Sequence, residues 1–332
     1  MLNFALIGYG YWGPNVARNL YKNKQIDFKY ICDLKQDRLD LAKGLYANDV
    51  QYTTSFDEVI ADESIDAVCL AVETSAHFEL GKRVIEAGKH LYVEKPFTDN
   101  VKQARELKAL AEQYGVTIHV DHIMIYHPAI IKIKEIIDRG ELGDVIYMDC
   151  SRMNLGKVKN DVSAMWDLSV HDLSIIDFLS DGAEVRTVKS MGRVIYSTKP
   201  SVTFITADYG SFIANIKANW ISPIKERKLI IAGTKKMLVY DDVDVLNKLI
   251  VNDKGFDVIN ASDPMEYSEF VVKTRSGDAV IPQLNVGDAL YNSLEHFRQC
   301  ILEKKESLSG PDAAIRVLTV LEEADKNMTV SR

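Results

Sequence analysis

The sequence predicts an α/β protein of two domains: an N-terminal parallel sheet covered by helices, and a C-terminal α+β domain with a large, mainly antiparallel open sheet. Three observations predict this fold. Apolar strand patterns alternate with helical patterns over roughly the first 120 residues, and a glycine-rich turn follows the first of them. Strand patterns then follow one another without helices in the second half. The predicted domains are 1–121 and 122–332.

The elements of the first domain alternate in type along the chain. Glycines after the helical patterns, such as Gly88 and Gly115, suit the left-handed C-cap of a helix. The predicted strands are Phe4–Ile7, Phe28–Cys32, Ala67–Val72, His90–Val93 and Thr117–Val120, and the predicted helices are Pro14–Tyr21, Asp37–Tyr46, His77–Ala87 and Val101–Tyr114.

The second domain begins with helical patterns and continues mainly as strands. Asp208-Tyr-Gly210-Ser resembles a hairpin turn between two of them. The predicted helices are Pro128–Arg139, Trp166–Leu179, Gly287–Leu302 and Pro311–Met328, and the predicted strands are Asp144–Cys150, Arg186–Ile195, Val202–Asp208, Ser211–Trp220, Arg227–Ala232 and Met237–Tyr240.

Composition limits the classes of function. The 332 residues are 47% hydrophobic and carry a net charge of −8, which argues against nucleic acid and anionic membranes as partners. The four cysteines lie far apart without metal-binding spacing, and Cys32 and Cys69 fall in strand patterns as core residues. No signal peptide or membrane-spanning stretch is recognisable, so we expect a reduced, cytoplasmic protein.

The glycine-rich turn reads Gly8-Tyr9-Gly10-Tyr11-Trp12-Gly13 and lies between a strand and a helix. In that setting the glycines permit a tight turn, approach of a pyrophosphate to the backbone, and packing of helix on strand. Pro14 suits the first turn of the helix, whose N-terminus attracts phosphate. The turn therefore predicts a dinucleotide site in a Rossmann domain, with an ordinary α/β turn as the alternative.

Asp33 ends the second predicted strand, 20 positions after Gly13 (33 − 13). A carboxylate there can bind both ribose hydroxyls of adenosine, which favours NAD over NADP. The alternative is an aspartate that caps the next helix. Lys35 and Arg38 follow closely and could hold a 2′-phosphate, so NADP stays open.

Glu94-Lys95-Pro96 follows a predicted strand, at the carboxyl edge where open parallel sheets bind ligands. The lysine can protonate, orient or polarise a substrate oxygen there. The bond before proline can adopt the cis form, which would fix the direction of the lysine. A surface turn is the alternative.

Asp167 and His171 are four residues apart in a helical pattern and would share one face of the helix. A histidine with a carboxylate one turn back is a candidate proton acceptor for a hydroxyl. A plain surface pair is the alternative, and Asp172 points elsewhere.

These motifs, in this order, resemble the glucose–fructose oxidoreductase/inositol dehydrogenase (Gfo/Idh/MocA) family over essentially the whole chain. Gly140-Glu-Leu-Gly143-Asp144 and Gly233-Thr234 extend the resemblance. It implies that Lys95 and His171 line the substrate and that Asp167 assists. It also implies an oligomer, a homodimer or homotetramer.

A narrower resemblance points to the branch that acts on nucleotide sugars. It involves Gly10–Asn15, Ser151-Arg-Met-Asn-Leu-Gly156 and Trp166-Asp-Leu-x-x-His-Asp172. It implies an NAD-dependent dehydrogenase acting at C3 of a UDP-N-acetylhexosamine or its uronic acid, with Arg152 and Asn154 as substrate contacts. A solvated strand end is the alternative for those two residues. Other sugar or polyol oxidoreductases, ketosugar reductases and a non-catalytic NAD-binding regulator are the alternative functions.

One departure from the family concerns the loop after the strand that ends at Val72. The usual proline is Glu73, while His77 matches. No metal is expected, because hydride transfer needs none. The predicted cofactor-binding residues are Gly8, Gly10, Tyr11, Trp12, Gly13, Asp33, Arg38, Ala71, His77, Glu94 and Lys95.

Overall fold

The computed structural model describes residues 1–46, 50–259 and 271–331. The chain divides into two compact units, one of Met1–His127 with Gly287–Glu322 and one of Pro128–Val286 with Glu323–Arg332. This division differs from the predicted boundary at residue 121, because a long segment near the C-terminus returns to the first unit.

Unit 1 contains a six-stranded sheet in the order β3-β2-β1-β4-β5-β6, and every neighbouring pair is parallel. The predicted parallel sheet of a Rossmann domain is thus confirmed. The three-residue β3 and the short α3 have no counterpart among the predicted elements. The strands are β1 (Leu2–Ile7), β2 (Ile26–Cys32), β3 (Gln51–Thr53), β4 (Ala67–Leu70), β5 (His90–Glu94) and β6 (Ile118–Asp121).

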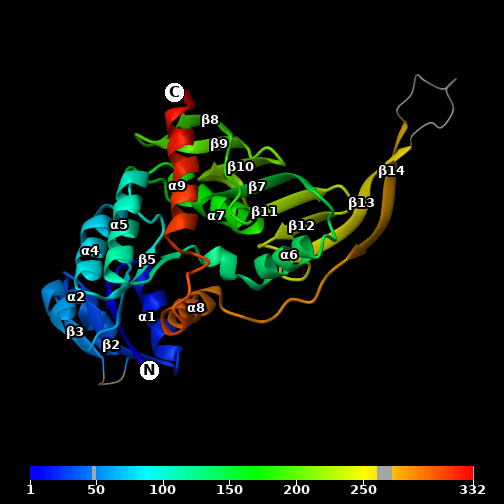
Figure 1. The fold of residues 1–332 in the computed structure, drawn as a ribbon. Helices are drawn as coiled ribbons and strands as arrows, with labels where there is room; N and C mark the ends of the chain where they lie inside the picture. The colour runs from blue at the N-terminus through cyan, green and yellow to red at the C-terminus, as the bar shows by residue number, and fades with distance from the viewer. Residues whose placement is uncertain (47–49, 260–270, 332) are drawn as a thin grey trace. The chain divides into compact units, whose positions relative to one another are not determined.

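Helices cover this sheet. Figure 1 shows α4 beside α5, and α1 lies against α8. Gly115 caps α5 with a φ of 66°, as predicted. The helices are α1 (Gly13–Lys22), α2 (Gln36–Lys43), α3 (Phe56–Ala61), α4 (Thr74–Glu86), α5 (Val101–Tyr114), the 3-10 turn η1 (Ile123–Tyr126), α8 (Ala289–Glu303) and most of α9 (Pro311–Lys326).

Helix α8 belongs to unit 1 because its apolar face completes the core of that unit. The ring of Phe297 meets Phe4 of β1 edge-on at 5.8 Å between centroids. Asn292 Nδ2 donates to the backbone oxygen of Tyr126 over 3.3 Å, which ties η1 to the same unit. Burial of aromatic rings is a large favourable contribution to folding, and it holds this late segment to the first strands.

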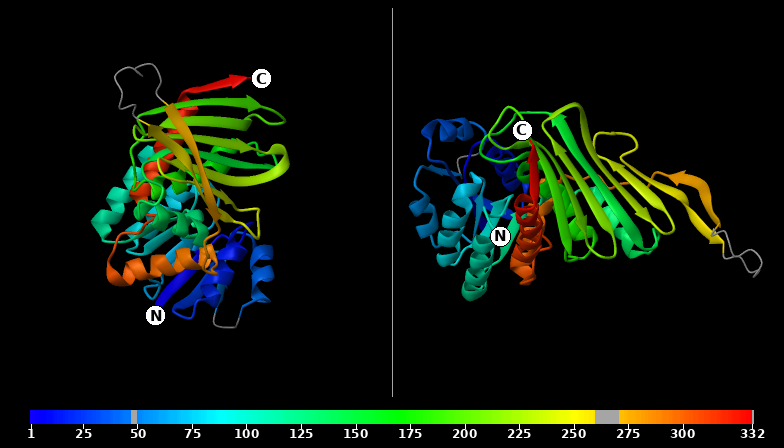
Figure 2. Two further views of the ribbon diagram at one scale, coloured as in Figure 1. Left: turned by 90° about the vertical axis from the view of Figure 1, so that its right-hand side faces the viewer. Right: turned by 90° about the horizontal axis from the view of Figure 1, so that it is seen from above.

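Unit 2 is built on a nine-stranded sheet in the order β14-β13-β12-β11-β7-β10-β9-β8-β15. It is mainly antiparallel, as predicted, with parallel pairs at β7/β10 and β8/β15. Figure 2 shows these strands side by side. The strands are β7 (Val145–Leu155), β8 (Thr187–Val194), β9 (Pro200–Asp208), β10 (Ile213–Asn219), β11 (Ile221–Gly233), β12 (Met237–Asp241), β13 (Leu249–Ile259), β14 (Val271–Val280) and β15 (Met328–Ser331).

The helices of unit 2 are α6 (Pro128–Asp138), the π-helical turn η2 (Met165–Ser169) and α7 (Val170–Leu179). The predicted hairpin turn joins β9 to β10, where Gly210 has a φ of 85° and its N–H donates to Asp208 Oδ1 over 2.7 Å. Strands β13, β14 and β15 were not among the predicted elements.

All four cysteines are buried and form no disulfide, and Cys32 and Cys69 lie in the core as predicted. Across the described ranges, none of the helices is both long and apolar enough to cross a membrane.

Candidate functional site

The glycine turn after β1 is shaped by close backbone approaches. Gly8 has a φ of 96°, and a Cβ there would lie 2.5 Å from the backbone oxygen of Ala71. A Cβ on Gly13 would collide with the backbone of Gly8. A Cβ on Gly10 would meet nothing within 4 Å. Packing therefore requires glycine at 8 and 13, whereas Gly10 leaves backbone open to a ligand, as a pyrophosphate needs.

Helix α1 begins at Gly13 directly after this turn. No side chain caps its first turn, and Pro14 occupies a position whose N–H would have no helical partner. Tyr11 is 96% exposed beside it. The open turn and the uncapped helix start fit the phosphates of a dinucleotide.

Asp33 lies directly after β2, with its carboxylate held by backbone N–H groups. Its Oδ2 accepts from the N–H of Tyr9 over 2.7 Å, and its Oδ1 accepts from the N–H of Lys35 over 2.9 Å. The carboxylate is thus fixed beside the glycine turn, where a ribose of a bound dinucleotide needs it. Lys35 and Arg38 are exposed.

We expect Asp33→Ala to weaken NAD binding by about 10–100-fold, because hydrogen bonds to a charged group contribute about 1.5–3 kcal/mol. Calorimetric titration of both variants with NAD and NADP measures the change. Asp37→Ala, an exposed carboxylate in the first turn of α2, is the matched control. An unchanged Kd for NAD in Asp33→Ala contradicts the assignment.

Lys95 follows β5 at the carboxyl edge of the sheet, and the Lys95–Pro96 bond is cis. His77 supports this segment from α4. Its Nδ1 lies 3.0 Å from the backbone oxygen of Pro96 and its Nε2 lies 3.2 Å from that of Val72. Burial lowers the pKa of His77. The ring ties the turn after β4 to the segment after Lys95, which is a structural role; its cofactor contact stays a prediction.

Glu94 is buried, and its side chain faces Asp121, its partner in the β5–β6 register. Its predicted contact with the cofactor also stays a prediction. The indole Nε1 of Trp12, from the glycine turn, is buried and has no hydrogen-bond partner among the described residues.

Asp167 and His171 lie in unit 2, where the predicted helix is confirmed with a local change. Asp167 belongs to the wider π-helical turn η2, and His171 is the second residue of α7. Lys159 Nζ lies 2.9 Å from Asp167 Oδ1, and Trp220 Nε1 donates to Asp167 Oδ2 over 3.3 Å. Single π-helical turns are frequent at functional sites. The sequence did not indicate Lys159 and Trp220 as partners, because no spacing signals contacts from a loop and from the bend between β10 and β11.

Arg152 forms a buried ion pair with Asp172 of α7. Its Nη2 lies 2.8 Å from Asp172 Oδ1, and the side chains are 8% and 5% exposed. Asp172 indeed points away from His171, toward β7. The pair gives Arg152 a structural role besides its predicted substrate contact, and Asn154 lies half-buried near the end of β7.

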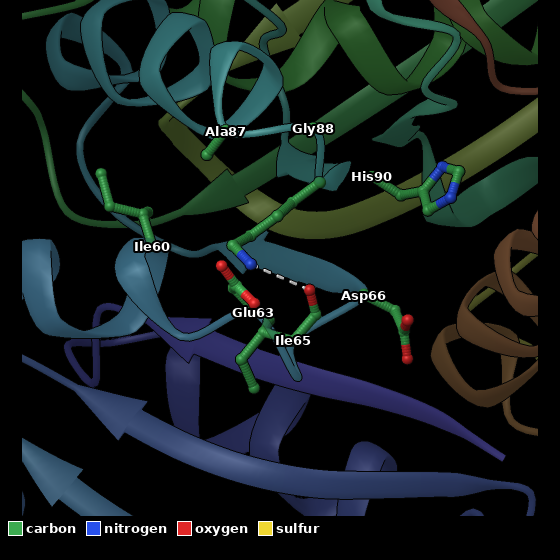
Figure 3. A pocket seen from close by; sticks show the side chains of 8 residues that line it. Ile60, Glu63, Ile65, Asp66, Ala87, Gly88 and His90 are labelled. Carbon is green, nitrogen blue, oxygen red and sulfur yellow. Dashed lines mark hydrogen bonds between the residues drawn. The ribbon is translucent and has the colours of Figure 1, made fainter.

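A cavity of about 310 Å³ lies at the opposite edge of the parallel sheet, before β4 and β5 begin (Figure 3). Two of its polar side chains, Lys89 and Asp66, already have structural partners. Lys89 Nζ donates to the backbone oxygens of Asp62 and Ile65 over 2.7 and 3.0 Å. Asp66 Oδ2 accepts from the N–H of Asn3. Open α/β sheets bind ligands at the other edge, so this cavity is not the candidate site.

We expect Lys89→Met to lower the free energy of unfolding by about 1–3 kcal/mol, because one buried and one partly buried carbonyl oxygen lose their donor. Denaturant unfolding measures this. Lys29→Met, which removes only a partly exposed ion pair with Asp27, should change it by less than about 0.5 kcal/mol. Equal effects of the two substitutions would refute the role of Lys89.

Buried histidines make unit 1 sensitive to acid. Burial lowers the pKa of His122 to about 3 and also lowers those of His77 and His119. Unfolded histidine binds a proton near pH 6.5, so the unfolded state takes up more protons as pH falls below that value. Each such histidine then costs about 1.4 kcal/mol of stability per pH unit. We expect the free energy of unfolding of His122→Asn to fall less steeply between about pH 6.5 and 4 than that of the native protein, by the equivalent of about one proton. The same pH dependence in both proteins would contradict this role of His122.

In the part of the chain that the structure describes, no group of three or more His, Cys, Asp or Glu side chains could hold a metal ion.

Comparisons with known proteins agree with these features. Residues 2–122 match the model of the oxidoreductase family with an NAD-binding Rossmann fold, and residues 130–239 match the C-terminal domain of GFO/IDH/MocA proteins. The scyllo-inositol 2-dehydrogenase (NAD(+)) of Bacillus subtilis is 27% identical over 92% of this chain and 98% of its own length. The UDP-N-acetylglucosamine 3-dehydrogenase of Acidithiobacillus ferrooxidans is 28% identical over 59% of this chain and 60% of its own length.

Solved structures share the fold. The UDP-N-acetylglucosamine 3-dehydrogenase GnnA from Acidithiobacillus ferrooxidans superposes with a TM-score of 0.80 at 24% identity, covering 98% of this chain and 97% of its own. GenD2 from gentamicin A biosynthesis, in complex with NAD, superposes with a TM-score of 0.80 at 20% identity, covering 98% of this chain and 93% of its own.

Proposed function

The chain belongs to the GFO/IDH/MocA family of NAD-binding oxidoreductases, and on that premise we propose that it transfers hydride between NAD and the C3 carbinol of a nucleotide-linked sugar, a UDP-N-acetylhexosamine or its uronic acid. One observation supports the oxidoreductase chemistry most strongly. The parallel strands β1, β2 and β5 end at the same edge of the sheet, so the open glycine turn, Asp33 and Lys95 all follow strand ends at that edge.

In this proposal each side chain has a separate chemical role. NAD, when bound, accepts or returns the hydride. His171 takes the proton of the substrate hydroxyl, and Asp167 keeps the imidazole or a neighbouring hydroxyl oriented. The ammonium group of Lys95 stabilises the negative charge that develops on the oxygen. Lys159 and Trp220 hold the carboxylate of Asp167 in place from two sides.

The nucleotide-sugar substrate is supported by the relative and the solved structure named UDP-N-acetylglucosamine 3-dehydrogenase. A thermal-shift experiment tests it before any turnover is seen. Stabilisation by UDP but not by free sugars, each with NAD present, supports a nucleotide-sugar site. Stabilisation by free inositols or aldoses without any response to UDP contradicts it.

A sugar or polyol dehydrogenase is the second candidate, because the inositol dehydrogenase relative matches 92% of the chain. A ketosugar reductase would use the same side chains in the reverse direction. A non-catalytic regulator would bind NAD without needing Lys95, Asp167 and His171 together.

We also propose a homodimer or homotetramer. Apolar pairs across neighbouring strands lie exposed on the sheet of unit 2: Met191 opposite Phe204, and Tyr147 opposite Ile213. Exposed apolar clusters of this kind favour association. Sedimentation analysis of the purified protein tests the oligomer, and a monomer at micromolar concentration contradicts it.

A further inference from the structure

Two buried carboxyl groups face each other on neighbouring strands of unit 1. Glu94 ends β5 and Asp121 ends β6, and the two are register partners. Glu94 is 9% exposed and Asp121 is 1% exposed. Glu94 Oε1 and Asp121 Oδ2 are both buried and have no hydrogen-bond partner within the described ranges. Ionised carboxylates are acceptors only, so a single proton between them would satisfy both oxygens.

The donors around this pair are concentrated on Asp121. Ser293 Oγ donates to Asp121 Oδ1 over 3.1 Å. Tyr92 also favours the ionised form of Asp121, and its hydroxyl lies 3.0 Å from Ser293 Oγ. Glu94 has the backbone N–H of Lys95. Because donors stabilise the charged form of a carboxyl group, the negative charge belongs on Asp121 and the proton on Glu94.

A chain of hydrogen bonds directs the Ser293 hydroxyl toward Asp121. Burial holds the pKa of His119 well below its usual value, so the ring is neutral with one N–H. Ser307 Oγ lies 2.8 Å from His119 Nδ1, and His119 Nε2 lies 2.9 Å from Ser293 Oγ. If Ser307 donates to Nδ1 and Nε2 donates to Ser293, the single hydroxyl proton of Ser293 remains for Asp121.

We propose that Glu94 and Asp121 share one proton and act as a singly charged positioning pair for Lys95. This inference rests on the proposed role of Lys95. One negative charge on the pair balances one ammonium group, whereas two buried negative charges would repel each other and none would leave Lys95 without this counter-charge. Glu94 also accepts the backbone N–H of Lys95, so the pair holds both the charge and the chain of the lysine.

The remaining titratable groups that face the pair are neutral near pH 7. Burial raises the pKa values of the Cys69 thiol and of the Tyr92 and Tyr126 hydroxyls, and lowers that of His122 to about 3. The positive charge that balances the pair is therefore that of Lys95, whose ammonium group lowers the pKa values of both Glu94 and His122.

Carbon-13 NMR of the protein labelled at glutamate carboxyl carbons tests the sharing directly. Glu94→Gln identifies the Glu94 resonance by its loss. In the native protein this carboxyl should be protonated at pH 7 and ionise only at higher pH. Asp121→Asn should shift its titration to lower pH, because a like charge is removed and the new amide can donate. Asp66→Asn, at the opposite edge of the sheet, is the control and should leave the titration of Glu94 unchanged.

If Asp121→Asn does not fold, aspartate labelling compares Asp121 in the native protein and in Glu94→Gln. In the native protein the Asp121 carboxyl carbon should shift a second time at the pH where Glu94 ionises, and Glu94→Gln should remove that second shift. An ionised Glu94 at pH 7, or titrations that do not respond to the partner's substitution, would overturn the shared proton. These spectra need no substrate, so an absence of dehydrogenase activity would refute the proposed function and leave this test intact.

The positioning role has its own readout in the pH profile of kcat/KM. Removing the single negative charge of the pair in Glu94→Gln/Asp121→Asn should move the alkaline limb to lower pH, because Lys95 loses its counter-charge. A purely structural role would lower kcat/KM at all pH values without moving the limb, and that outcome would overturn the positioning role while the enzyme remains active.

Discussion

Lys95→Met is expected to lower kcat by about 10²–10⁴-fold, while the Kd for NAD changes by less than about threefold. The ammonium group is proposed to act on the oxygen whose charge develops during hydride transfer, so its loss affects the transition state more than the bound cofactor. Lys95 follows a strand end at the carboxyl edge of the sheet, and its segment is held by His77 and Glu94. Steady-state kinetics and calorimetric NAD titration measure the two quantities separately.

Lys102→Met is the matched control, since Lys102 is an exposed lysine on α5. It should keep the native kcat and Kd. If Lys95→Met lost NAD affinity and turnover by equal factors, the side chain would serve cofactor binding and its catalytic role would be wrong.

His171→Gln is expected to lower kcat by about 10²–10⁴-fold, with the largest loss at neutral pH, because glutamine cannot accept the hydroxyl proton. Loss of the proton acceptor should also remove the acid limb of the pH profile of kcat. The measurement is the pH dependence of turnover for both variants.

His90→Asn serves as the control for a lost imidazole. His90 lies at the other edge of the sheet, where its Nδ1 accepts from the N–H of Thr117. Asparagine can keep an acceptor there, so turnover should stay near the native value. Unchanged turnover in His171→Gln would remove proton transfer from the account.

The sequence predicted the parallel sheet and the sites at its strand ends because both depend on local signals. Alternation of apolar strands with helices and the Gly8–Gly13 turn are readable within a few residues. The strand β3 has only three residues, which is too short for an alternation of apolar and polar residues to be recognised. Helix α8 was placed in the second domain because its pattern does not show that Phe297 packs on Phe4.

Polar partners across long sequence separations were also invisible in the sequence. The sequence did not show that the carboxyl of Glu94 faces Asp121, or that Ser293 donates to Asp121 from 172 residues away. The sequence also showed no sign that Arg152 and Asp172 form an ion pair, because the pair depends on how β7 packs against α7. The helix near Asp167 was predicted, but its π-helical turn has no pattern in the residue spacing.

The most direct test of the central claim is NADH absorbance when purified protein is mixed with NAD and a panel of UDP-hexosamines, UDP-hexosaminuronates, free sugars and inositols. The account predicts that, within this panel, only UDP-sugars give NADH, and that Lys95→Met lowers the rate by about 10²–10⁴-fold. Turnover with free sugars or inositols and none with UDP-sugars would contradict the nucleotide-sugar substrate.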